Sequence, residues 1–157
     1  MRALGFGALF FGIVLSHVSM ARDGRPSWSR NDSGVVVFGM PESDQIYLTL
    51  SCRVQNEISV DIVMRPDGLR DHQQTTAVFE AAGRTLRRIA TAPISDGLDG
   101  DNVIVVTSPS DELFDLMIGP KQLAVSVGQT KQLFPLKGAA ELIKSLRRDC
   151  SASQARP

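Results

Sequence analysis

The stretch LFPLKGAAELIKSLRRDC, residues 133–150, decides the fold that this sequence predicts. It begins as the end of a strand, Pro135 and Gly138 interrupt it, and apolar residues then recur at helical spacing as far as Cys150. This spacing predicts one amphipathic helix whose apolar stripe and final sulfur share the buried face. The chain has only one other cysteine, Cys52. We therefore expect a Cys52–Cys150 disulfide that joins this helix to a strand far upstream.

The N-terminus predicts export. Met1-Arg2 supplies a short positive segment, residues 3–15 are apolar or small, and Ser19-Met20-Ala21 offers small residues to a signal peptidase. We expect a signal peptide over residues 1–21 that is cleaved after Ala21. Its apolar run is shorter than the roughly 20 residues that span a bilayer, so the mature chain is not expected to be an integral membrane protein. The destination is periplasmic or extracellular, and either compartment is oxidising enough to keep a disulfide.

The composition limits the classes of partner. The chain carries 17 basic and 17 acidic residues, and no segment has the clustered positive excess that nucleic-acid binding requires. For the mature part we expect an irregular lead-in over residues 22–34. A single β-rich domain over residues 35–150 and a disordered tail over residues 151–157 then follow.

Short segments that alternate between apolar and polar residues fill most of the domain, and turn residues separate them. A second helix is expected after Ser110 as its N-cap, ending at Gly119-Pro120. Residues 84–90 also fit a short helix, although we favour a strand. The pattern predicts a mainly β fold, an antiparallel β-sandwich or open barrel of about eight strands with the C-terminal helix packed on it. The predicted strands cover residues 35–38, 46–52, 57–65, 75–80, 84–90, 103–107, 123–127 and 131–136.

Three side chains are candidates for a surface binding site: Trp28, Tyr47 and His72. Trp28 is the only tryptophan, and its ring has a second interpretation as a plug of the core, because a lone tryptophan more often packs than recognises a ligand. His72 lies in a polar segment without a second histidine in the mature chain, so zinc binding is hard to build around it.

Two acidic segments superficially match known sites. Asp96, Asp99 and Asp101 supply oxygen ligands of the kind that calcium prefers, but the spacing is not that of an EF-hand and the closing glutamate is missing. A plain turn is favoured there, and no metal or other cofactor is expected. Residues 32–34, Asp-Ser-Gly, match the aspartic protease signature, but polar residues precede them where an apolar strand should lie.

Four segments carry a resemblance to known proteins: Trp28, FGMPESD at residues 38–44, LTLSC at residues 48–52, and FPLKGAA at residues 134–140 with Cys150. On these segments the chain resembles short exported proteins of alphaproteobacteria, most of them uncharacterised. Its closing segment is similar to the end of the invasion-associated locus B family, periplasmic β-rich proteins that end with a strand, a glycine and a short helix. The resemblance implies an exported β-rich protein and assigns no functional residue.

Export, a stapled β-rich fold and the lack of a catalytic motif favour a non-enzymatic binding module. Its expected partner is an envelope protein or a cell-wall component, and inhibition of a wall-degrading enzyme falls within this class. Two alternatives stay open. The first is a hydrolase whose residues converge only in three dimensions, around Asp71, His72 and residues 96–101. The second is a structural component of the envelope.

Overall fold

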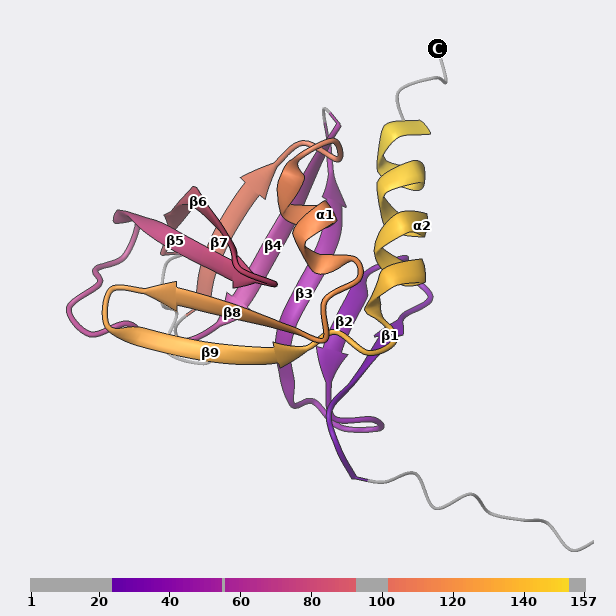
Figure 1. The fold of residues 1–157 in the computed structure, drawn as a ribbon, viewed down its shortest axis with the longest axis horizontal. Helices are drawn as coiled ribbons and strands as arrows, with labels where there is room; N and C mark the ends of the chain where they lie inside the picture. The colour runs from indigo at the N-terminus through magenta and orange to yellow at the C-terminus, as the bar shows by residue number, and fades with distance from the viewer. Residues whose placement is uncertain (1–23, 55, 93–101, 153–157) are drawn as a thin grey trace, which may run out of the picture.

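The computed structural model describes residues 24–54, 56–92 and 102–152 of the chain. These residues form one antiparallel sheet and two helices, and the elements are labelled in Figure 1. The predicted class, mainly β with a C-terminal helix and one disulfide, is confirmed. The strands are β1 Ser27–Arg30, β2 Val36–Gly39, β3 Ile46–Arg53, β4 Glu57–Val63, β5 Gln74–Ala81, β6 Arg84–Thr91, β7 Asn102–Thr107, β8 Gln122–Val127 and β9 Thr130–Pro135, and the helices are α1 Glu112–Met117 and α2 Ala139–Ala152.

The strands lie in the order β1-β2-β3-β4-β7-β6-β5-β8-β9. Most neighbours share four or more residue pairs, but among the described residues β6 and β7 share only Thr91 with Ile104. The sheet can bend sharply at this joint, because little of the backbone ladder holds the two strands parallel there. In Figure 1 the strands β5, β8 and β9 accordingly run across the direction of β3 and β4. The fold is therefore one open, bent sheet and not two separate ones.

Two boundaries differ from the sequence prediction. Residues 27–30, expected within an irregular lead-in, form strand β1, which pairs with β2 from Ser27↔Gly39 to Arg30↔Val36. This edge strand buries only Trp28, and its other residues are polar. The sequence therefore shows no apolar alternation from which the strand could be predicted. Helix α2 also continues to Ala152, so the disordered tail predicted from residue 151 begins too early. The predicted tail beyond that helix and the predicted signal peptide lie outside the described residues.

The predicted cap of the first helix is wrong by one residue. Asp111, not Ser110, is the N-cap of α1, and its side chain accepts a hydrogen bond from the backbone N–H of Leu113 at 2.7 Å. Either residue type can cap a helix, but only Asp111 also faces Arg88 on β6. Residues 84–90, for which a helix was the alternative, belong to strand β6.

Helix α2 covers the inner face of β1, β2, β3 and β4 (Figure 1). Its buried stripe is the one that the sequence predicts and ends in Cys150, which is bonded to Cys52 across a separation of 98 residues. Two arginine side chains connect helix α2 to neighbouring elements. Arg30 of β1 donates to Asp149 at 2.7 Å, and Arg147 donates to Asp115 of α1 at 2.7 Å.

Aromatic contacts draw the two ends of the sheet together. The indole Nε1 of Trp28 on β1 donates to the carbonyl of Pro135 on β9 at 2.6 Å. The ring of Phe38 lies between these two strands, with its centroid 5.2 Å from that of Trp28 and 5.9 Å from that of Phe134. Side-chain packing thus joins β1 to β9, the two ends of the strand order.

A charged network bridges the weak joint of the sheet. The guanidinium of Arg88 on β6 donates to both carboxylate oxygens of Asp111, at 2.8 and 2.6 Å, and Thr107 at the end of β7 donates to the same carboxylate. Burial raises the pKa of Asp111, but the hydrogen bonds from Arg88, Thr107 and Leu113 together outweigh burial, and this pKa lies below its ordinary value. Asp111 therefore connects β6, β7 and α1 where the backbone ladder is thin.

Removing the disulfide is expected to destabilise the fold strongly. A Cys52→Ala/Cys150→Ala double variant should lose about 4–5 kcal/mol of unfolding free energy, because the bond closes a long loop in the unfolded chain. Urea unfolding followed by tryptophan emission measures this loss. Wild-type protein kept in reductant is the control and should unfold at the same urea concentration as the variant. Equal midpoints for the variant and the oxidised wild type would contradict the expectation.

The Asp111 network is expected to make stability depend on pH. Because the folded-state pKa of Asp111 is lowered, its contribution is fully present above the unfolded value of about 3.9 and is lost as the pH falls through the folded value. Asp111→Asn should cost about 1–3 kcal/mol at pH 7, and the difference from wild type should shrink below about pH 4. Glu112→Gln, which alters an exposed ion pair to Arg84 at 3.6 Å, is the matched control and should change stability by less than about 1 kcal/mol. A pH-independent difference for Asp111→Asn would argue against the network.

Candidate functional site

The three candidate binding side chains occupy different environments. Trp28 is only 9% exposed and Tyr47 is half-buried, and both rings contact Phe38, at centroid distances of 5.2 and 6.1 Å. Trp28 is thus a core contact, the second interpretation that its sequence allowed. His72 is exposed in the turn before β5, where its backbone has φ +58° and its N–H donates to the carbonyl of Ala92 at 2.9 Å. The structure brings Trp28 and Tyr47 together, and His72 does not belong to their cluster.

Most of the acidic candidates cannot be placed in the fold. Asp96, Asp99 and Asp101 lie outside the described residues, and Asp71 is exposed beside His72. Within the described part of the chain, no three His, Cys, Asp or Glu side chains gather closely enough to hold a metal ion. Neither helix in the described ranges is long and apolar enough to cross a bilayer.

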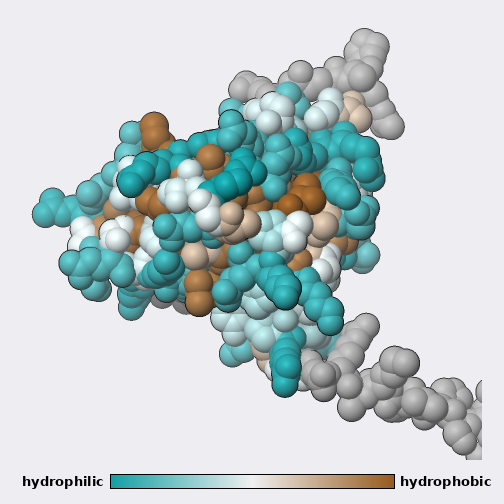
Figure 2. All heavy atoms as spheres, viewed as in Figure 1, coloured by the Kyte–Doolittle hydropathy of each residue, from teal (hydrophilic) through white to brown (hydrophobic). Residues whose placement is uncertain are grey.

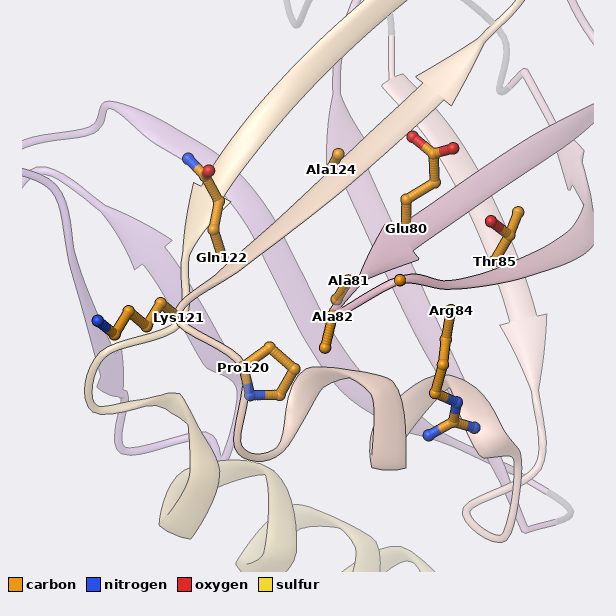
Figure 3. A pocket seen from close by; sticks show the side chains of 10 residues that line it. Glu80, Ala81, Ala82, Arg84, Thr85, Pro120, Lys121, Gln122 and Ala124 are labelled. Atoms are coloured by element: carbon orange, nitrogen blue, oxygen red, sulfur yellow. The ribbon is translucent and has the colours of Figure 1, made fainter.

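A hollow of about 500 Å³ lies at the turn between β5 and β6 (Figure 3). Two of its charged side chains have partners: Glu80 accepts from Lys131 at 2.9 Å, and Arg84 lies 3.6 Å from Glu112. Figure 3 shows the side chain of Lys121 pointing away from those of Glu80 and Arg84. The polar groups therefore do not converge on one point, as they would in a small-molecule site.

The helix-bearing side of the molecule is largely hydrophilic. Figure 2, which views the molecule as Figure 1 does, shows hydrophilic residues over much of the surface, with hydrophobic residues in scattered patches between them. Ile89 on β6 is 69% exposed and Leu133 on β9 is 57% exposed. Single exposed apolar side chains of this kind are normal on soluble proteins.

A second surface lies on the opposite face of β2, β3, β4 and β7, which we call the outer face. The inner side chains of these strands, such as Leu48, Leu50 and Val60, are fully buried. The outer positions alternate with them, so neither the core nor α2 covers this face. The outer face consists of Val37 on β2, Thr49, Ser51 and Arg53 on β3, Glu57, Ser59, Asp61 and Val63 on β4, and Asn102, Ile104 and Val106 on β7.

The strand register aligns these residues in rows across the sheet. Val37 lies opposite Thr49, Thr49 opposite Asp61, and Asp61 opposite Ile104. On either side of this row, Val63 and Val106 keep 36% and 39% of their surface exposed. The row places one carboxylate among β-branched apolar and hydroxyl side chains.

Within the described ranges, two hydroxyl groups and no cation bind the carboxylate of Asp61. The hydroxyl of Ser59, itself 6% exposed, donates to one carboxylate oxygen at 2.6 Å, and Thr49 donates to the other at 3.4 Å. The ion pairs found among the described residues do not include Asp61. Its negative charge therefore faces the surface without an opposite charge beside it.

The sequence pointed to only part of this face. The candidate Tyr47 is not part of it, because its ring packs on Phe38 of the core. Val63, Ile104 and Val106 carried a usable signal, because each is apolar at the position where the alternation should place a polar residue. The pairing of β4 with β7, which brings Ile104 beside Asp61, joins segments that are distant in sequence and has no local signal.

Comparison with family models, with curated proteins and with solved structures found no match to this chain. The resemblance to exported alphaproteobacterial proteins therefore stays a prediction. What the protein does has to be argued from its surfaces.

The burial of Trp28 gives a prediction about the aromatic cluster. As the only tryptophan, Trp28 should give blue-shifted emission that acrylamide quenches weakly until the protein unfolds. Trp28→Phe should cost about 1–3 kcal/mol, since it removes the indole donor to Pro135 and part of the packing. Thermal unfolding followed by circular dichroism measures this cost. Tyr47→Phe, which keeps the ring, is the control, and an equal cost for both variants would contradict this role of Trp28.

Proposed function

We propose that this protein is a non-catalytic, exported binding module that holds another protein of the cell envelope on its outer face. The observation that carries the proposal is the exposure of Val63 and Val106 on two paired strands inside the sheet, beside the row that contains Asp61. Contiguous exposed apolar surface with polar groups in it is characteristic of protein-binding sites.

Shape favours a protein over a small molecule. The outer face is a surface of paired strands, whereas small ligands are generally held in concave sites that bury most of their surface. The hollow at the β5–β6 turn is lined by other residues. A macromolecular partner can cover several strands at once, as a standard protein interface does.

The disulfide supports export. Cys52 and Cys150 are the only cysteines of the chain, and they are bonded to each other. Structural disulfides persist in the periplasm and outside the cell and are rare in the reducing cytosol. The predicted signal peptide, residues 1–21, is consistent with this location, and an envelope protein is the partner class that such a location offers.

Site-specific crosslinking tests the proposal. Benzoylphenylalanine placed at Val106 should give a discrete adduct with one protein in an envelope extract of the producing cell. The same group at Leu133, which is more exposed and lies on β9 at the other end of the strand order, is the matched control and should give none. Val63→Asp should abolish the adduct at position 106 while changing stability by less than about 1 kcal/mol, because Val63 is partly exposed.

The crosslinking has clear contrary results. Adducts of equal yield at positions 106 and 133 would mean that the outer face has no preference over other exposed positions. The proposal would equally fail if position 106 gave no adduct, or if Val63→Asp left the adduct unchanged in a folded protein.

A further inference from the structure

We infer that the partner places a lysine or arginine side chain on Asp61 when it covers the outer face, an inference that rests on the proposed function. Asp61 stands in the aligned row between Thr49 and Ile104, in the interior of strand β4. A partner that covers Val63 and Val106 must therefore cover Asp61 as well, because the pair of Asp61 and Ile104 lies between the positions of Val63 and Val106 along β4 and β7.

Within the protein the carboxylate of Asp61 is only partly satisfied. Its two hydrogen bonds come from neutral hydroxyls, those of Ser59 and Thr49. Other carboxylates on this chain are paired with cations: Asp111 with Arg88, and Glu80 with Lys131. The residues opposite Asp61 on the neighbouring strands are Thr49 and Ile104, and the ion pairs found among the described residues do not include Asp61.

The desolvation of Asp61 on binding determines which partners the outer face accepts. A wholly apolar partner would remove water from an ionised carboxylate and return nothing, which is strongly unfavourable. An acidic partner would add repulsion at the same point. A basic side chain surrounded by apolar residues restores the lost interaction and lets the apolar rows make contact, so the outer face accepts this chemistry and rejects the other two.

Three matched tripeptides probe the inference: acetyl-Val-Lys-Val-amide, acetyl-Val-norleucine-Val-amide and acetyl-Val-Glu-Val-amide. They are titrated into the full mature domain, and amide shifts of Thr49, Asp61 and Ile104 are followed by two-dimensional NMR. The lysine peptide should bind about fivefold more tightly than the norleucine peptide, the ratio expected for one accessible ion pair. The glutamate peptide should produce no saturable shift at these amides.

Asp61→Asn should remove the preference, so that lysine and norleucine peptides bind equally. Glu80→Gln, which alters a carboxylate on the other half of the sheet, should retain it. Weakly quenched tryptophan emission verifies that each variant folds. Salt supplies a test without mutation: raising sodium chloride from roughly 20 mM to about 500 mM should weaken only the lysine peptide, because it screens an accessible pair.

The outcomes separate this inference from the proposed function. Equal, saturable binding of the lysine and norleucine peptides to the wild type would overturn the role of Asp61 and leave the outer face as a binding surface. A lysine preference that survives in Asp61→Asn, or that salt does not reduce, would overturn it as well. If no peptide shifts these amides the inference is also wrong, and crosslinking at Val106 then decides the proposed function on its own.

Discussion

The bond between Cys52 and Cys150 is the constraint on which the rest of the structure depends. It fixes the end of α2 to the end of β3 and so commits the helix to one face of the β1–β4 half of the sheet. Helix α2 and the second half of the sheet both occupy the inner side of strands β1–β4. Only the opposite side of these strands stays open. The outer face is thus a consequence of where the disulfide places the helix.

The bent sheet needs connections that its backbone does not provide. Among the described residues a single residue pair joins β6 to β7, and two side-chain systems add further connections between the two halves of the sheet. Asp111, with Arg88 and Thr107, links the strands through α1, whereas Trp28 links the far ends of the strand order through its bond to Pro135. A charge-assisted cluster and an aromatic cluster thereby do what a continuous ladder of hydrogen bonds does in a closed barrel.

The sequence could predict the features that depend on local periodicity and on the number of cysteines. Alternation located eight strands, the helical stripe located α2, and the presence of two cysteines left one pairing to expect. Strand β1 was not predicted, because Trp28 is its only buried residue. The N-cap of α1 is Asp111 and not Ser110, because a tertiary contact with Arg88 favours Asp111. The outer face could not be predicted, because it requires the strand order, which long-range pairing sets and local patterns do not encode.

An exposed face of β-branched residues carries a hazard that a central charge removes. Flat apolar sheet surfaces associate with one another, and natural β proteins place charged residues on them to prevent it. If two copies of this chain met outer face to outer face, two Asp61 carboxylates would be desolvated against each other with only hydroxyls as donors. The same charge leaves the surface open to a partner that supplies a cation. An ionised carboxylate at a point that binding must cover would therefore both oppose self-association and favour the basic partner that we propose.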